Sequence, residues 1–211
     1  MIRWIKAWFP LLYGIGFTGL LLFLGIYLAP FNVEVWAQLV GPSRGAKVDV
    51  PMMVIQSALV VFALGVLVKL LERIDPKFKP RQIVRANCNL YPLTRRWWRW
   101  PFALLLMWSL PVLAQLEELI FRHGFGIYPT ETMTDIVVRS IGFGLFHALA
   151  SWNYRGGIVQ ALLGFWFSYQ YLINPVDPVF HAGFAHFLVD LFAFTPGVLA
   201  LLMTKGEPQS S

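Results

Sequence analysis

Two uninterrupted apolar runs constrain the fold of this chain more than any other feature of its sequence. Residues 10–30 contain no charged side chain, and residues 51–71 are broken only by Gln56 and Lys69. A helix rises about 1.5 Å per residue, so roughly 20 apolar residues cross the hydrocarbon core of a bilayer. Both runs have this length, and they predict membrane-spanning helices.

The composition extends this prediction to the whole chain. Hydrophobic residues make up 57% of the sequence and charged residues 13%, whereas soluble domains contain roughly 45–50% and about 25%. We expect an all-α fold, a polytopic transmembrane helical bundle of about six spans, as a single membrane domain over residues 1–211. The further spans are predicted at residues 101–121, 133–150, 156–173 and 179–203.

Basic residues gather between the second and third predicted spans. Residues 73–100 are rich in Arg and Lys, whereas the loop before the second span has only two basic residues, Arg44 and Lys47. The positive-inside rule therefore places residues 73–100 in the cytoplasm, and Arg3 and Lys6 place the N-terminus on the same side. We expect a protein integral to a prokaryotic cytoplasmic membrane, with both termini cytoplasmic.

Tryptophan and arginine alternate at the end of this basic loop, from Arg95 to Trp100. Trp rings favour the headgroup region of a bilayer, and arginine binds lipid phosphate. Residues 73–100, which begin at Arg73, are therefore expected to bind anionic lipid. No nucleic-acid partner is expected, because such a partner needs exposed aromatic side chains on a soluble basic face.

Two adjacent carboxylates interrupt the third predicted span at Glu117 and Glu118, followed by Arg122. Ionisable groups in a membrane helix cost about 2.5–3.5 kcal/mol each on insertion scales, so each needs a reason to be there. Glu118 and Arg122 lie four residues apart on one helical face and can neutralise each other, whereas Glu117 is rotated by about 100°. Glu117 must then face a polar cavity, meet a partner from another helix or stay protonated. It is either a general base or a second structural carboxylate.

Two later spans carry further polar pairs at a spacing of one helical turn. Phe143 and His147 share a face, and the neighbouring glycines let another backbone approach. His186 and Asp190 form the second pair on an otherwise apolar helix. Together with the carboxylates, these pairs predict a buried polar site between three helices.

Two other histidines have different expected surroundings. His181 follows Pro175 and Pro178 and is expected near the start of its helix, at the membrane interface. His123 is expected to contact only headgroups or water.

The chemistry of the buried site has three readings. A glutamate with two histidines can activate water for hydrolysis, bind a divalent metal, or relay protons in a transporter. No cofactor is expected. The metal alternative is zinc, with Glu117, His147 and His186 as its ligands.

At these residues the sequence resembles the CAAX protease and bacteriocin-processing (CPBP, or Abi) family of intramembrane proteases, also called type II CAAX prenyl endopeptidase-like proteins. The family motifs E-E-x-x-x-R, F-x-x-x-H and H-x-x-x-N/D are matched in family order by Glu117, Glu118, Arg122, Phe143, His147, His186 and Asp190. The resemblance covers residues 110–194. It implies a catalytic core at residues 101–203, preceded by variable spans and the basic loop at residues 1–100.

The resemblance implies an intramembrane glutamate-type endopeptidase that hydrolyses a membrane-associated or lipidated protein or peptide. Glu117 and His147 would activate water, and His186 with Asp190 would support the oxyanion. Glu118, Arg122 and Phe143 would support the site. The alternatives are a non-catalytic scaffold or bacteriocin-immunity protein, and a proton-coupled transporter.

Two residues depart from the family pattern. An ionised Asp190 accepts hydrogen bonds, unlike the Asn of prenyl-protein proteases, so it either fixes the tautomer of His186 or is protonated. His123 precedes Gly124 where many members have Gly directly after the motif arginine.

Span boundaries raise a geometric difficulty. A third helix that ended at Phe121 would leave Glu117 near the outer face of the membrane and His147 near the inner one. We therefore expect this helix to reach about Tyr128, and the following helix to begin below the outer surface.

Overall fold

A computed structural model describes residues 2–40, 48–74, 93, 97–127, 129–151 and 154–203 of the chain. This part of the chain is helical and contains no strand, which confirms the all-α prediction. The elements are α1 (Ile2–Tyr27), α2 (Ala29–Val40), α3 (Val50–Ile74), α6 (Arg99–Phe121), the short 3₁₀ helix η2 (Gly124–Gly126), α7 (Met133–Ser151), α8 (Tyr154–Ile173) and α9 (Pro178–Met203).

Fewer helices than expected have the length and composition of membrane spans. Among the described residues, α3, α6 and α9 are long and apolar enough to cross a membrane, and α1 with α2 adds a fourth if the bent pair forms one span. The expected number of six is not reached. Helices α7 and α8 form where spans were predicted, but polar residues such as Asp135, Arg139 and Gln170 lower their hydropathy.

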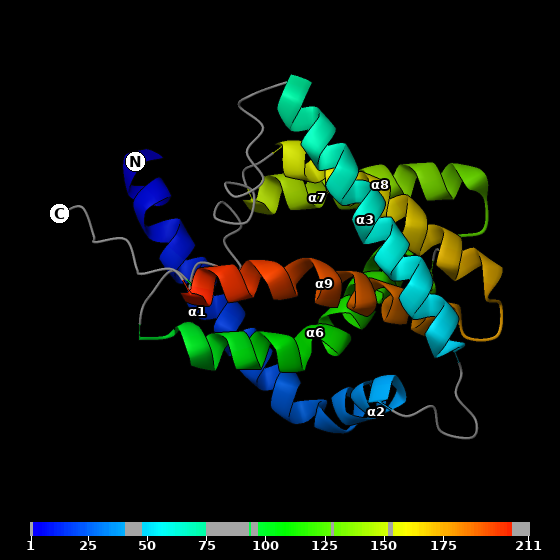
Figure 1. Cartoon of the computed structure of the whole chain (residues 1–211), viewed down its shortest axis with the longest axis horizontal. Coiled ribbons are helices and arrows are strands. Elements are labelled where there is room, and N and C mark those ends of the chain that lie inside the picture. The colour runs from blue at the N-terminus through cyan, green and yellow to red at the C-terminus, as the bar shows by residue number, and fades with distance from the viewer. Residues whose placement is uncertain are drawn as a thin grey trace.

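The first predicted span is broken where the sequence analysis expected a continuous helix. Helices α1 and α2 meet at an angle of 79°. Pro30 lies in the first turn of α2, where its missing N–H costs nothing, whereas its ring would clash inside a continuing helix. Helix α2 was not predicted. It lies beneath α6 in Figure 1, and the Trp36 indole donates to the carbonyl of Trp108 over 3.5 Å.

Helices α6 and α9 lie side by side at the centre of the molecule and run in opposite directions (Figure 1). The guanidinium of Arg99, at the start of α6, donates to the carbonyl of Leu201 near the end of α9 over 3.2 Å. Helix α3 crosses α8 and α9 on one side, where the amide of Gln170 donates to the side-chain oxygen of Gln56 over 3.4 Å.

Helices α7 and α8 pack with their backbones close together. A Cβ at Gly144 would lie 2.9 Å from the backbone nitrogen of Ala161, and one at Gly157 would lie 2.6 Å from the Cβ of Ala148. This confirms the predicted close approach at Gly144. A Cβ at Gly142, two residues earlier, would meet nothing within 4 Å.

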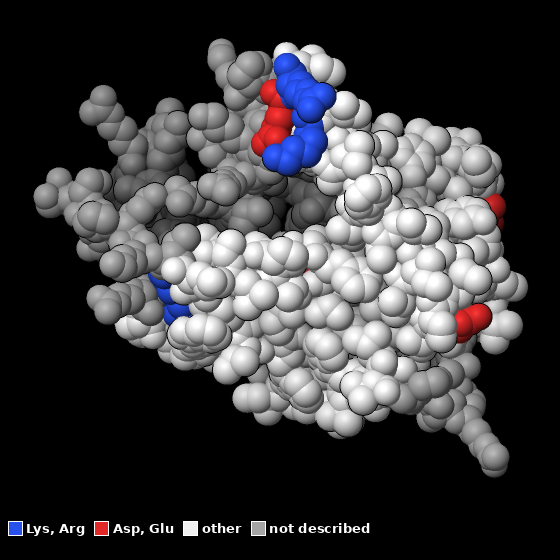
Figure 2. Space-filling model, viewed as in Figure 1, with Lys and Arg blue, Asp and Glu red and all other residues white. Residues whose placement is uncertain are grey.

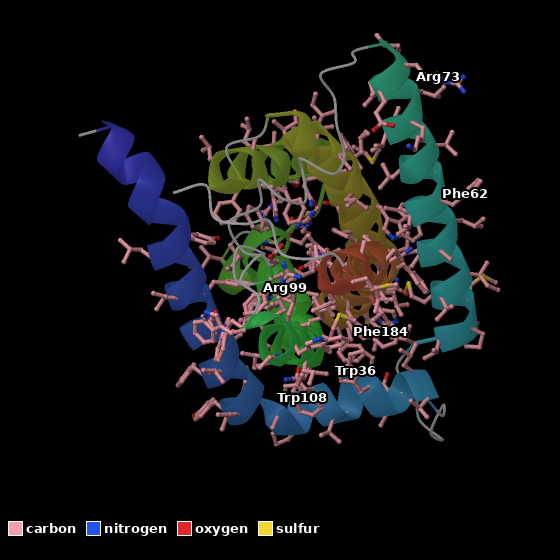
Figure 3. The ribbon with its side chains drawn as sticks, turned by 60° about the vertical axis from the view of Figure 1, so that its left-hand side comes forward. Trp36, Phe62, Arg73, Arg99, Trp108 and Phe184 are labelled. Atoms are coloured by element: carbon pink, nitrogen blue, oxygen red, sulfur yellow. The ribbon has the colours of Figure 1, made fainter. Side chains whose placement is uncertain are left out.

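The outer surface of the bundle is largely apolar. Phe62 of α3 is 71% exposed and points away from the other helices, whereas Trp36 and Phe184 lie between α2 and α9 (Figure 3). Figure 2 shows few charges on the described part of one face, and the largest group of them lies at the end of α3, where Lys69 and Glu72 form an ion pair. This surface suits contact with lipid chains.

Only part of the predicted lipid-binding loop can be compared with the structure. Trp97 and Trp100 are exposed, as an interfacial belt requires, but Arg99 is buried beneath the end of α9. Arg99 therefore does not face lipid, because its charge meets backbone carbonyl oxygen instead. Arg73 is exposed at the end of α3, and the remaining basic positions of the predicted loop lie outside the described residues: Lys77, Lys79, Arg81, Arg85, Arg95 and Arg96.

Candidate active site

The adjacent carboxylates of α6 point to different partners, as their helical spacing predicts. The Oε2 atom of Glu118 lies 3.2 Å from Nε of Arg122, and both side chains are fully buried. Glu117 points instead toward α7 and α9, where its Oε2 atom lies 3.6 Å from Nε2 of His147 and 3.8 Å from Nε2 of His186. Glu117 therefore meets partners from other helices.

Arg122 is anchored by α8, a helix to which the sequence analysis assigned no role in the site. Its Nε atom donates to the hydroxyl of Ser168 over 3.3 Å, and its Nη2 atom donates to the carbonyl of Gly164 over 3.1 Å. Since these N–H groups point to α8, Oε2 of Glu118 interacts with Arg122 by charge and accepts no hydrogen bond. The ring of Phe143 lies 4.4 Å from the guanidinium carbon.

His186 connects the structural pair to the other acidic groups. Its Nδ1 atom lies 2.7 Å from Oε1 of Glu118, and its Nε2 atom lies 3.5 Å from Oδ2 of Asp190. A carboxylate beside Arg122 can only accept, so Nδ1 of His186 carries a proton. Glu118, rather than Asp190, therefore fixes the tautomer of His186. This corrects one of the two roles that the sequence analysis gave to Asp190.

His147 has the same tautomer for a different reason. Its Nδ1 atom bonds to the carbonyl of Phe143 over 2.9 Å, and a carbonyl can only accept. Nδ1 therefore carries the proton, and the Nε2 atom that faces Glu117 is an acceptor when the ring is neutral. Oε2 of Glu117 is itself buried and accepts no hydrogen bond. Oε2 of an ionised Glu117 and Nε2 of a neutral His147 are therefore both acceptors, and neither can donate a hydrogen bond to the other.

The remaining histidines lie away from this space. Nδ1 of His181 bonds to the carbonyl of Asp177 in the first turn of α9, near the helix start as expected. His123 was expected to contact only headgroups or water, but its Nδ1 atom lies 2.8 Å from the hydroxyl of Tyr171. Tyr171 comes from α8, which the sequence analysis did not expect beside His123.

The end of α6 differs from the prediction that brought Glu117 and His147 together. The helix ends at Phe121 instead of continuing to Tyr128, which lies outside the described residues. Gly124 and Gly126 turn the chain with φ angles of 54° and 80°, in the region that favours glycine.

This turn returns the chain directly to the side of α6. The hydroxyl of Thr130 and the guanidinium of Arg139 donate to the carbonyl of Arg122, and Phe121 packs edge-on against Phe143. Helix α7 therefore passes the last turns of α6, and Glu117 meets His147 without a longer helix.

The predicted zinc ligands are close together, but they do not form a ligand set. Within residues 2–40, 48–74, 93, 97–127, 129–151 and 154–203, no group of three or more His, Cys, Asp or Glu side chains is arranged to hold a metal ion.

No protein-family model, no curated protein and no solved structure matches this chain. The class that the fold defines is an all-helical protein with helices able to cross a membrane and a buried cluster of carboxylates and histidines. The resemblance to the CPBP family therefore depends on the motif residues themselves.

Proposed function

We propose that this chain is an intramembrane endopeptidase of the glutamate type, similar to the CPBP family, that cleaves a membrane-associated or lipidated protein. One observation carries the proposal. Oε2 of Glu117 accepts no hydrogen bond, and the Nε2 atom of His147 that faces it is an acceptor in the neutral ring. The separation of 3.6 Å is too long for a direct hydrogen bond, so we place a water molecule beside the pair, where both atoms can accept its protons.

In the proposed reaction this water is the nucleophile. Glu117 takes one proton as the water oxygen attacks the peptide carbonyl carbon, and His147 orients the water through Nε2. The carbonyl π electrons move to the oxygen and form a tetrahedral oxyanion. The C–N bond then breaks, and the proton held by Glu117 passes to the leaving amine.

His186 supplies the charge that this oxyanion needs. Its Nδ1–H bonds to Glu118, and a second proton on Nε2, shared with Asp190, makes the ring a cationic donor. Such a donor, placed before the charge develops, stabilises the transition state. Asp190 thus supports the oxyanion through the His186 proton rather than by donating itself.

The proposed setting is a prokaryotic cytoplasmic membrane. If the bent pair of α1 and α2 counts as one span, the even number of spans returns the C-terminus to the side of the N-terminus. Both termini are then cytoplasmic, with residues 73–100 on the same side against anionic lipid.

The test uses the purified chain reconstituted in lipid. Its substrate is the protein that accumulates uncleaved in a strain from which this chain has been deleted, and the assay measures cleavage of that protein. Glu117→Gln and His147→Ala should lose about 10²- to 10⁴-fold in kcat, because each removes a proton-transfer or water-binding group. His181→Ala, on the same helix as His186 but outside the cluster, should keep full turnover. Full turnover by Glu117→Ala would refute the mechanism.

A chelator provides the second arm of this test. Turnover should be unchanged in its presence. Loss of turnover on chelation, restored by zinc, would replace the water-activating role of Glu117 with a metal site of Glu117, His147 and His186.

A proton-coupled transporter is the second candidate, because His186 lies 2.7–3.8 Å from three carboxyl groups, those of Glu118, Asp190 and Glu117. Chains of such titratable groups relay protons in membrane pumps. Proton flux into proteoliposomes that Glu117→Gln abolishes, without peptide cleavage by the wild type, would favour this reading. If the wild type shows neither proton flux nor peptide cleavage, and Glu117→Gln keeps the biological activity of the wild type, a scaffold or immunity protein is favoured.

A further inference from the structure

Helix α8 carries none of the predicted site residues, yet one of its faces contacts Arg122, Phe143 and His186. Gly164 and Ser168 hold Arg122, as described above, and Phe167 lies between them in sequence on the same side of the helix. The ring of Phe167 stacks on the imidazole of His186, with centroids 4.1 Å apart and planes inclined by 18°. Phe167 is fully buried.

The orientation of the His186 ring needs such a support. The χ2 torsion of histidine is broad and roughly two-fold, so the rotamer preferences of the side chain do not decide which edge faces Glu118. A half-turn about χ2 would replace Nδ1 by a carbon and break the 2.7 Å bond to Glu118. It would also take Nε2 away from Glu117 and Asp190.

The hydrogen bond to Glu118 selects between these two half-turn orientations, and two aromatic rings fix the plane of the imidazole, which sets the directions of Nδ1 and Nε2. Phe167 covers one flat face of the imidazole, and Phe143 meets the ring in a T-shaped contact with centroids 5.7 Å apart. Aromatic pairs stabilise beyond their buried area, and the attraction is stronger when one ring is cationic. A stacked Phe167 therefore favours the observed plane of the ring, in which Nδ1 and Nε2 reach their partners, and the cationic form that the oxyanion step uses.

We propose that Phe167 is a positioning residue, which holds the His186 imidazole so that Nδ1 bonds Glu118 and Nε2 faces Glu117 and Asp190. The inference deepens the proposed peptidase function and rests on it. Phe167 touches no reacting atom, and it acts only through the orientation and proton affinity of His186.

The test measures the protonation and hydrogen bonding of the His186 ring nitrogens by NMR. The chain has four histidines, so ¹⁵N-histidine labelling in lipid nanodiscs, with His186→Gln for assignment, isolates the His186 signals. The wild type should show a single Nδ1–H resonance with the downfield proton shift of a strong hydrogen bond. Phe167→Leu and Phe167→Met should lose this resonance or split it between two tautomers, whereas Phe167→Tyr, which keeps the ring, should retain it.

Phe184→Leu is the matched control, because Phe184 is equally buried on α9 but packs against Phe180 and Phe187 outside the site. This variant should leave the His186 resonance unchanged. An unchanged resonance in Phe167→Leu or in Phe167→Met would overturn the proposal, and so would its loss in Phe184→Leu.

Turnover separates the inference from the function on which it rests. With the protein substrate recovered from the deletion strain, Phe167→Leu should lower kcat by at least about tenfold with little change in KM, because misplacement of catalytic groups acts on the reacting step. If Glu117→Ala is fully active while the resonance behaves as expected, the peptidase mechanism fails and the positioning role stands. If turnover depends on Glu117 but the Phe167 variants keep the resonance, the reverse holds.

Discussion

The close packing of α7 on α8 leads to a prediction with a matched control inside the same helix. Gly144→Ala and Gly142→Ala make the same chemical change two residues apart. The new Cβ at position 144 would lie 2.6 Å from the Cβ of Ala161, against an ordinary carbon contact of about 3.5–4.0 Å, whereas the one at position 142 would meet nothing within 4 Å.

The two substitutions should change stability in opposite directions. Replacing glycine by alanine inside a helix stabilises it by about 0.5–1 kcal/mol, and both variants gain this contribution. Only Gly144→Ala forces the helix backbones apart, and such overpacking costs about 1–3 kcal/mol. The helix contribution cancels in the comparison, so Gly144→Ala should be less stable than Gly142→Ala by about 1–3 kcal/mol.

Reversible unfolding of both variants in mixed micelles measures this difference. Turnover gives a second readout, because His147 follows Gly144 by three residues and its Nε2 atom lies 3.6 Å from Glu117. A displacement of about 1 Å at a reacting group can cost on the order of 10² in rate. Equal stability and equal turnover of the two variants would show that α7 and α8 do not approach as described.

Three further outcomes are expected. Arg122→Ala leaves Glu118 buried without its cation and should cost about 3–5 kcal/mol in the free energy of unfolding, whereas Arg122→Lys should cost less. Gly164→Ala should lower both stability and turnover, because its Cβ would lie 2.9 Å from the backbone Cα of Ser140 and 3.1 Å from Nη2 of Arg122; unchanged stability and kcat would contradict this. Hydrogen bonds from the Thr132 hydroxyl, and to a smaller extent from backbone N–H groups, lower the pKa of Asp135. The stability that ionised Asp135 contributes is therefore fully present above its unfolded pKa of about 4 and is lost as the pH falls through its lower folded pKa. Asp135→Asn should flatten the dependence of stability on pH in this acidic range.

Local sequence rules predicted the helices well because each depends on a run of neighbouring residues. The expected segments at 51–71, 101–121 and 179–203 correspond to α3, α6 and α9. The rules failed where one residue changes the path of the chain. Pro30 ends the first helix and starts α2, and Gly124 and Gly126 end α6 before Tyr128.

Polar spacing on single helices also predicted part of the site. The four-residue separation of Glu118 and Arg122 was sufficient to pair them, because residues one turn apart share a helical face. The same spacing left the partner of Glu117 open, since no rule of sequence places α6 beside α7 and α9.

The sequence by itself determined an all-helical chain with segments long and apolar enough to span a membrane, and with a few ionisable residues that are costly to place in such segments. Only the tertiary structure decided which atoms face each other. It directed Nδ1 of His186 to Glu118 rather than to Asp190, and it brought in Phe167 and Ser168 from a helix whose sequence has no distinguishing motif. The physical reason is that these contacts join residues far apart in the chain, and their geometry is fixed by how the helices pack.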